Sequence, residues 1–198
     1  MIMIAAYRGE GNSVNQEALL IEKARDGDIS AFEKLISLYE KKIYNYCYRM
    51  TNNHEDAEDL AQEVFIKVYR NLNKFKGNSK FSTWIYRIAY NTCVDKYRKK
   101  RKAKIFSLDY FNDEGVGNMQ PVSDNPLPED EVIQKERYEK IQACIASLKP
   151  KYKTVIILRD IQNYSYEEIA EILQLPLGTV KSHINRARAA LTDALKGK

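Results

Sequence analysis

Apolar residues recur every three or four positions over long stretches of the chain, which is the spacing of one face of an α-helix. After Asp28, a suitable N-cap, this pattern runs from Phe32 to Met50 without a break and predicts one long amphipathic helix. The polar stretch Thr51–Asn53 interrupts the pattern. We therefore expect the helix to end there and another helix to follow.

Three more helices are predicted around this one. An amphipathic pattern continues to Leu72, with acidic residues in its first turns and basic residues in its last, the order that the helix dipole favours. A polar turn at Lys76–Ser79 separates it from a helix that starts near Phe81. A short helix around Gln16–Arg25 ends at Gly27. The first hundred residues are thus predicted to form four helices.

The pattern changes in the middle of the chain. From Ala103 to Pro128 the helical spacing is lost, and acidic residues occur among prolines and glycines, which predicts an extended linker. Helices resume near Glu129, with three shorter ones after Pro150. The predicted fold is all-α: a four-helix domain and a second small helical domain joined by a flexible acidic linker. The expected parts are a disordered N-terminus 1–14, a first domain 15–104, a linker 105–128 and a second domain 129–198.

Charge is distributed in blocks along these parts. Residues 1–104 carry 20 Lys and Arg against 13 Asp and Glu, residues 105–131 carry seven acids and no base, and residues 132–198 carry 12 bases against seven acids. Two basic domains around an acidic spacer indicate that the domains bind a polyanion. No apolar stretch is long enough to span a membrane, and the N-terminus lacks the features of a signal peptide, so we expect a cytoplasmic protein.

Cysteine and histidine give no sign of a metal or redox site. Cys47, Cys93 and Cys144 are far apart and lie in apolar helical patterns, which is typical of buried reduced thiols in a cytosolic protein. His54 and His183 are isolated, and no cluster of carboxylates or nucleophiles appears. We therefore expect no metal, no cofactor and no enzymatic activity.

The most specific pattern of the second domain is YSYEEIAEILQLPLGTVKSHINRARAAL, residues 164–191. Ser165 and Glu168 have the spacing of a capping box that opens a short helix. QLPLG supplies a tight turn, and the small Ala170 lies where a second helix would cross the first. These features predict a helix-turn-helix, a unit whose second helix usually enters the major groove of DNA.

The outer face of that second helix carries side chains that suit DNA binding. At about 100° per residue, the positions opposite its apolar stripe are polar or basic. Arg and Asn bond bidentately to base edges, while Lys and Ser bond phosphates or bases. The candidates for reading duplex DNA are Thr179, Lys181, Ser182, Asn185 and Arg186. The alternative is an ordinary solvated helix face. It does not explain why a capping box, a tight turn and outward-facing basic side chains occur together.

The stretch from Phe75 to Lys102 combines aromatic rings with positive charge. On a helical wheel its residues form an apolar stripe around Trp84, a second stripe of Tyr86, Tyr90, Cys93 and Tyr97, and a third of Arg87, Asn91 and Arg98. Core packing explains only the first stripe. Rings beside cations suit a single strand, because unpaired bases stack on aromatic faces while cations hold phosphates. The small, polar loop before the helix suits a base swung out of the duplex.

Taken together, these segments resemble the extracytoplasmic-function (ECF, group 4) branch of the bacterial sigma-70 superfamily, the two-domain initiation factors of RNA polymerase. DAEDLAQEVFIKVYRNL is similar to the family's core-binding helix, and FKGNSKFSTWIYRIAYNTCVDKYRKKRK to its segment for minus-ten recognition and melting. The helix-turn-helix is similar to its reader of the minus-thirty-five element. The resemblance covers about residues 15–104 and 129–198. It implies a non-catalytic sigma factor that binds core polymerase, selects promoters and assists DNA opening.

The resemblance also implies roles for individual residues. The residues implied to bind core polymerase are Asp59, Gln62 and Glu63. The set for minus-ten recognition and melting of the non-template strand is Lys76, Asn78, Ser79, Lys80, Trp84, Tyr86, Arg87, Asn91, Asp95 and Arg98. The minus-thirty-five set consists of the five helix-turn-helix candidates on duplex DNA. Many relatives have arginine where this chain has His183, which leaves a phosphate contact there open.

Two further expectations come from the family alone. Such factors are commonly held inactive by an anti-sigma factor, and their linker threads toward the RNA exit channel; a solubilising spacer is the alternative for the linker. A free-standing helix-turn-helix regulator, whose first domain binds a ligand or partner, is the alternative for the whole chain. It leaves Gln62, Glu63 and the stretch of rings and cations unexplained. An enzyme acting on nucleic acid lacks the clustered site that it needs.

Overall fold

The computed structural model describes residues 16–107 and 140–196, and every regular element within these ranges is helical. The expected N-terminal segment 1–14, most of the linker 105–128 and the first residues of the helix near Glu129 lie outside the described residues. Within the described ranges, no helix has the length and apolar character needed to cross a membrane.

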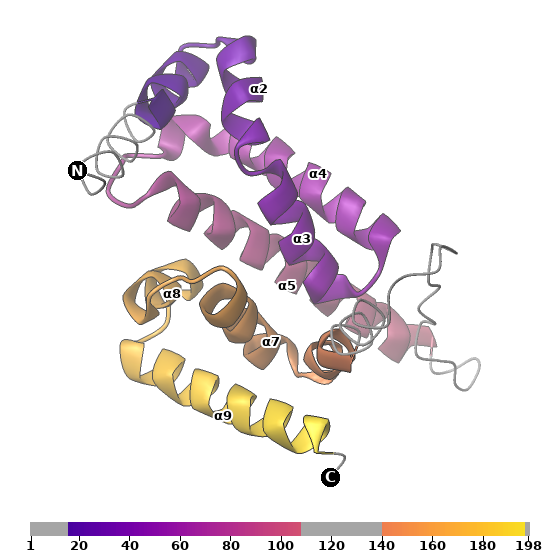
Figure 1. Cartoon of the computed structure of the whole chain (residues 1–198). Coiled ribbons are helices and arrows are strands. Elements are labelled where there is room, and N and C mark those ends of the chain that lie inside the picture. The colour runs from indigo at the N-terminus through magenta and orange to yellow at the C-terminus, as the bar shows by residue number, and fades with distance from the viewer. Residues whose placement is uncertain (1–15, 108–139, 197–198) are drawn as a thin grey trace, which may run out of the picture.

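In the first domain, α3 packs on α4, and both helices pack on α5, which lies on the side that faces the second domain (Figure 1). Helical residues 16–25 come first, and the chain leaves them through Gly27, whose φ of 95° lies in the region that favours glycine. The elements that follow are α2 (Ile29–Ser37), α3 (Glu40–Thr51), α4 (His54–Asn71), η1 (Leu72–Lys74) and α5 (Phe81–Ser107). The predicted break at Thr51–Asn53 is confirmed, because Asn52 has a left-handed φ of 55° and Asn53 caps α4.

The long helix expected from Phe32 to Met50 is in fact two helices, α2 and α3, and this prediction was wrong. The chain turns at Leu38 and Tyr39, where the Tyr39 backbone N–H bonds to the Ile36 carbonyl at 2.8 Å. The turn directs the Tyr39 ring into the core, where its hydroxyl donates to the Glu17 carboxylate and its ring packs on Phe81. Apolar spacing continues across the turn, so the periodicity alone could not reveal it.

The second domain contains the predicted helix-turn-helix. Helical residues 140–147 are followed by α7 (Pro150–Ile156), a π-helical segment η2 (Ile157–Ile161), α8 (Tyr166–Leu173) and α9 (Leu177–Leu195). The capping box at the start of α8 is confirmed: Ser165 and Glu168 each accept a hydrogen bond from the other's backbone N–H. Gln174, with a left-handed φ of 53°, ends α8. The buried residues of α9 are Val180, Ile184 and Ala187, as the periodicity predicts.

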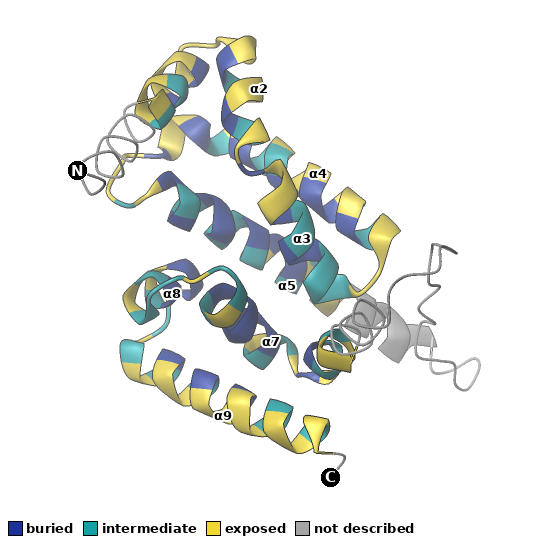
Figure 2. Cartoon of the chain, in the orientation of Figure 1, coloured by how far each residue is buried: buried dark blue, intermediate teal, exposed yellow. Residues whose placement is uncertain are grey.

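The two domains pack against each other. In Figure 1, α7 and α8 lie between α5 of the first domain and α9. The Tyr86 ring of α5 is buried between Tyr46 of α3 and Tyr164, which precedes α8, with ring centroids 5.5 and 5.2 Å apart. Figure 2 shows the consequence: buried positions lie where the helices of the two domains face one another, while the outer face of α9 is exposed.

Candidate nucleic-acid and protein interfaces

The outward face of α4 carries the three residues expected to bind a protein partner. Asp59, Gln62 and Glu63 are exposed, while Leu60, Ala61 and Val64 beside them are buried. The apolar side of the helix packs in the core, so this polar side is left for solvent or a partner. Glu63 pairs within the helix with Lys67 at 2.8 Å.

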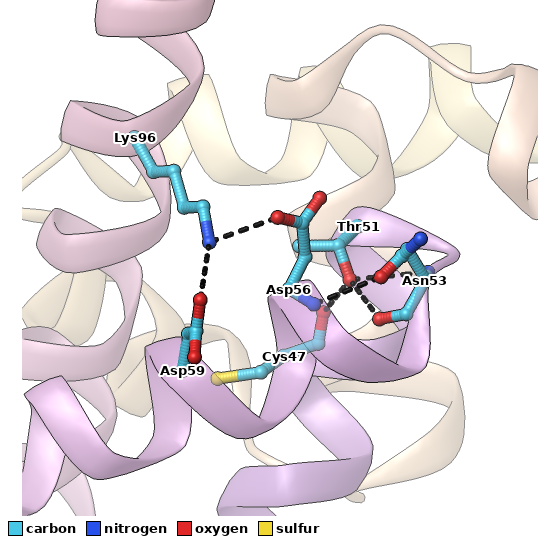
Figure 3. A network of polar contacts seen from close by, with 6 residues as sticks. All are labelled: Cys47, Thr51, Asn53, Asp56, Asp59 and Lys96. Atoms are coloured by element: carbon cyan, nitrogen blue, oxygen red, sulfur yellow. Dashed lines mark hydrogen bonds and ion pairs between the residues drawn. The ribbon is translucent and has the colours of Figure 1, made fainter.

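A polar network holds the start of α4 against α5 (Figure 3). The Lys96 ammonium of α5 lies 3.0 Å from the Asp56 carboxylate and 3.8 Å from that of Asp59. Next to it, Asn53 accepts a hydrogen bond from the Asp56 backbone N–H at 2.8 Å, and Thr51 donates to the Cys47 carbonyl at 3.0 Å. The first cation of the basic run at the end of α5 therefore braces α4 instead of facing solvent.

The loop before α5 presents polar side chains around a turn at Gly77. Gly77 has a φ of 73°, which suits glycine, and nothing lies within 4 Å of where its Cβ would be. Lys76, Asn78 and Lys80 are exposed and Ser79 is half-buried. The four residues expected to take a flipped base are thus brought together on one exposed loop.

The predicted strand-binding residues of α5 itself divide into three groups by their exposure. Asn91, Asp95 and Arg98 are exposed along one side of the helix, with Arg98 paired to Asp95 at 3.9 Å. Trp84 and Arg87 are half-buried, Trp84 because its ring packs on Phe75 and Phe81. Tyr86 is buried, with 1% of its surface exposed.

The interpretation of the second stripe as rings for base stacking does not fit this arrangement. Tyr86 and Cys93 lie in the core, Tyr90 is half-buried and only Tyr97 is exposed. α3 and Tyr164 cover the stripe, and neither contact was visible in the spacing of the residues. Burial raises the pKa of the Tyr86 phenol, with further increases from Tyr164 and Cys47. Tyr86 is therefore unavailable to a base in this arrangement of the domains.

The minus-thirty-five candidates lie together on the outer face of α9. Lys181, Ser182, Asn185 and Arg186 are exposed and Thr179 is half-buried. Ser182 donates to the Thr179 carbonyl at 2.9 Å, which holds its side chain along the helix. A helix with this much exposed polar surface, next to a capped α8, has the geometry of a recognition helix in a major groove.

Tyr152 of α7 was missed by the sequence reasoning, although it lies beside this face. Its hydroxyl accepts a hydrogen bond from Arg186, which lowers the pKa of the phenol, and the Lys151 ammonium lies 4.9 Å from its ring centre. His183 packs edge-on against the same ring at 5.7 Å. Burial, followed by the charges of Lys151 and Arg186, lowers the pKa of His183. His183 thus points toward α7, away from the position of an outward phosphate contact.

Two of the candidates for the minus-ten element are occupied by the second domain. Lys80 binds the Glu168 carboxylate at 2.8 Å, and Arg87 donates to the Glu171 backbone carbonyl at 2.8 Å. Arg87 also lies 3.5 Å from the Glu171 carboxylate. The Lys80 pair raises the pKa of Lys80 and lowers that of Glu168. These contacts join residues more than 80 positions apart, so no local pattern indicates them.

The cysteines and acidic residues form no metal-binding group in the described part of the chain. Cys47 and Cys93 are buried and Cys144 is half-buried, and all three are free thiols. The hydrogen bond with Cys47, together with burial, raises the pKa of the Cys93 thiol well above its usual value. Thiols in this state are poor nucleophiles at neutral pH.

Comparison with known proteins agrees with the geometry of both domains. Residues 35–103 match the Sigma-70 region 2 family and residues 138–191 match the Sigma-70, region 4 family. The chain is 45% identical over 177 residues to the ECF RNA polymerase sigma factor SigW of Bacillus subtilis, which covers 89% of this chain and 95% of that protein. This chain belongs to the ECF RNA polymerase sigma factors. It is also 35% identical over 184 residues to the ECF RNA polymerase sigma-E factor of Escherichia coli K12, covering 91% of this sigma factor and 94% of the relative.

Solved structures support the fold of this sigma factor. CnrH, solved in complex with the cytosolic domain of CnrY, matches 92% of this chain with a TM-score of 0.67 at 21% identity. The sigma factor RpoE of Bartonella quintana, solved with the anti-sigma factor NepR, matches 85% with a TM-score of 0.66 at 24% identity. These two structures confirm the two-domain all-helical fold. The alternative of a free-standing helix-turn-helix regulator finds no support among these relatives.

Proposed function

We propose that this sigma factor binds core RNA polymerase through α4 and directs it to promoters through α5 and α9. The observation that carries the proposal is the outward polar face of α4, Asp59, Gln62 and Glu63, on a domain that matches sigma-70 region 2. A simple duplex-binding regulator has no need of such a face. The region-4 domain supplies a second, separate DNA contact on the exposed side of α9.

The two DNA-binding surfaces, the outer face of α9 and the loop before α5 with α5 itself, have different chemistry and therefore different targets. Lys181, Asn185 and Arg186 carry the donors that reach base edges and phosphates of intact duplex DNA. The loop Lys76–Lys80, with Asn91 and Arg98 further along α5, presents polar and basic groups to an unpaired strand. The sigma factor itself supplies binding energy and no bond-making chemistry, so polymerase carries out RNA synthesis in the cytoplasm.

An anti-sigma factor is the regulator proposed for this chain. NepR is described as an anti-sigma factor in its complex with the related RpoE, and CnrY binds the related CnrH. We expect the same kind of partner here because the structural match extends over 99% of the CnrH chain and 98% of the RpoE chain.

Run-off transcription with purified core polymerase tests the function. Core enzyme with this chain should initiate at a defined start site on a cognate promoter, and permanganate should detect unpaired thymines near that site. Core enzyme alone should do neither. If the chain binds duplex DNA tightly by itself and leaves core enzyme unable to choose a start site, the proposal is wrong.

A further inference from the structure

A large cavity lies beside the basic end of α5, where residues 93–99 of that helix meet the chain between residues 146 and 153. The last turn of α3 and one side of α4 complete its wall, and its volume is about 1560 Å³. Pockets for small molecules commonly measure about 300–1,000 Å³, so a ligand as large as a nucleotide has room here. Of the lining residues, only Glu63, Asp95 and Arg98 belong to the predicted contacts with polymerase and DNA.

The wall of this cavity carries an excess of positive charge. Seven of its lining residues are Lys or Arg, and three are Asp or Glu. Each of the three carboxylates has a cation of its own: Glu63 pairs with Lys67 at 2.8 Å, Asp56 with Lys96 at 3.0 Å (Figure 3) and Asp95 with Arg98 at 3.9 Å. Four cations remain without a carboxylate partner among the described residues: Lys99, Lys149, Lys151 and Lys153.

Lys153 differs from the other three because it is buried. Its side chain lines the cavity although the residue is only 8% exposed. An ammonium has three N–H donors, yet within the described ranges Lys153 has a single acceptor, the Met50 carbonyl oxygen, at 3.4 Å. Burying a charge without an opposite charge is unfavourable, and burial lowers the pKa of this ammonium. An anion in the cavity would supply the missing partner.

The surrounding lysines indicate which kind of anion fits. Lys149 and Lys151 are exposed and lie two and four positions before Lys153, and the exposed Lys99 contributes from α5. Lysine binds phosphate groups as a point charge. A chain of two or three phosphates carries roughly three to four negative charges at neutral pH, which matches the four unpaired cations. Tyr97, 52% exposed on the same wall, offers a ring on which a nucleobase can stack.

We propose that this cavity is a binding site for an oligophosphate, with Lys153 as its buried cation and Lys99, Lys149 and Lys151 around the phosphates. The phosphate chain is either inorganic or carried by a nucleoside whose base stacks on Tyr97. A ligand that binds only the folded chain stabilises it by mass action, so the oligophosphate should raise the melting temperature. The site does not depend on the proposed function, which is tested separately by run-off transcription.

Titration calorimetry of the full-length chain with inorganic triphosphate tests the site. Lys153→Met keeps the length of the side chain and removes its charge. It should weaken binding about tenfold or more, because the loss of one partner of a buried charge pair is costly. Without ligand this variant should unfold no earlier than wild type, and triphosphate should raise its melting temperature by less. No detectable binding of triphosphate by the wild type would overturn the inference.

A second pair of variants keeps the test valid if Lys153→Met fails to fold. Lys149→Gln with Lys151→Gln removes two exposed charges from the cavity and should weaken triphosphate binding roughly three- to tenfold. Lys34→Gln with Lys41→Gln is the matched control, exposed and outside the cavity, and should stay within about twofold of wild type. Equal losses in the two double variants would mean that net charge alone attracts the anion, and would overturn the inference.

Two further ligands distinguish the source of the phosphates. If a nucleoside carries them, ATP without magnesium should bind more tightly than inorganic triphosphate, and Tyr97→Ala should abolish that difference. Equal affinities would identify the inorganic chain as sufficient, which also supports the site. Sulfate that binds as tightly as triphosphate would overturn the inference, because four cations should select a longer, more highly charged anion.

Reductive methylation of lysines, followed by mass spectrometry, locates the bound anion on the chain. Triphosphate should protect Lys99, Lys149 and Lys151 from methylation and leave Lys34 as reactive as before. Protection of Lys181 on α9 in place of these three would put the anion on the predicted DNA-reading face and would refute a site in the cavity.

Discussion

The Nζ of Lys153 on α7 lies 3.4 Å from the backbone carbonyl oxygen of Met50, in the last turn of α3. The contact joins the two domains, and Lys153 is only 8% exposed. A cation at the C-terminal end of a helix is favourable. No carboxylate among the described residues pairs with it, however, and burial lowers the pKa of its ammonium.

Replacing Lys153 with methionine should therefore stabilise the protein. Methionine keeps the length of the side chain and removes an incompletely paired buried charge, so the free energy of unfolding at neutral pH should rise by roughly 1–2 kcal/mol. Urea denaturation measures the change. Lys151→Met, on the exposed neighbour, is the matched control and should give no such increase.

The effect of Lys153→Met should depend on pH in a defined direction. The pKa of Lys153 is lower in the folded chain than in the unfolded one, so the unfolded state binds more protons between these two values. The wild type is therefore penalised fully below the folded pKa and recovers stability as the pH rises toward the ordinary lysine value of 10.5. The advantage of the variant should shrink over that window. An advantage that grows with pH would contradict this explanation.

Arg186→Ala should reduce promoter discrimination at one position of the minus-thirty-five element. A bidentate contact to a base edge contributes about 1–3 kcal/mol of discrimination, and its loss should leave the other positions unchanged. Run-off transcription or binding by holoenzyme across single-base substitutions of the element measures this. Equal losses on all sequences would show that Arg186 contacts phosphate instead.

Tyr152→Phe should produce a smaller loss at the same base pair as Arg186→Ala. The Tyr152 hydroxyl accepts a hydrogen bond from Arg186 and so orients the guanidinium from outside the recognition helix. In the Arg186→Ala background the Tyr152→Phe change should then have no further effect on specificity, because the two residues act as one unit. Additive losses would mean that Tyr152 acts independently.

Replacing Gln62 and Glu63 with alanine should weaken the affinity for core polymerase. Both side chains are exposed on α4, so the fold should lose only the Glu63–Lys67 pair, about 0.3–0.5 kcal/mol. Titration of core enzyme with labelled sigma factor measures the affinity. Glu58→Ala, exposed one turn earlier, is the control and should bind as wild type does. Binding of duplex DNA through α9 should be the same in all three chains.

Lys96→Met should destabilise the first domain. The ammonium bridges Asp56 and Asp59, and the Lys96 side chain is 25% exposed. Its removal leaves the partly buried Asp56 carboxylate without the positive charge of Lys96. We expect a loss of about 1 kcal/mol in the free energy of unfolding. Lys99→Met, on an exposed position of the same helix, should leave stability unchanged. Equal stability of the two variants would show that the bridge contributes nothing.

Much of the candidate site could be predicted from the sequence because its signals are local. The outward positions of Gln62 and Glu63 follow from helical periodicity, and those of Asn185 and Arg186 from the stripe on the opposite side of α9. The capping box at Ser165 needs only four consecutive residues. The roles of these residues in binding polymerase and DNA remain predictions.

Other features could not be predicted because they depend on contacts between distant parts of the chain. The apolar spacing continues through the turn at Tyr39, so the sequence predicts one helix where the structure has two. The turn is stabilised by packing of the Tyr39 ring on Phe81, which lies far away in the sequence. The stripe of Tyr86 and Cys93 has the pattern of an exposed second face, yet other helices cover it. Lys153 lies between Tyr152 and Thr154, two residues after the exposed Lys151, with no local sign that its charge would be buried.

Local chemistry along the chain was therefore enough to place most of the helices, their caps and the polar faces of α4 and α9, since these depend on neighbours within one or two turns. The relation between the domains required the folded molecule. Lys80 meets Glu168 and Arg87 meets Glu171 only because α5 and α8 pack side by side, across more than 80 positions of sequence. Helical periodicity acts over a few residues, whereas such pairing depends on how complete surfaces fit together.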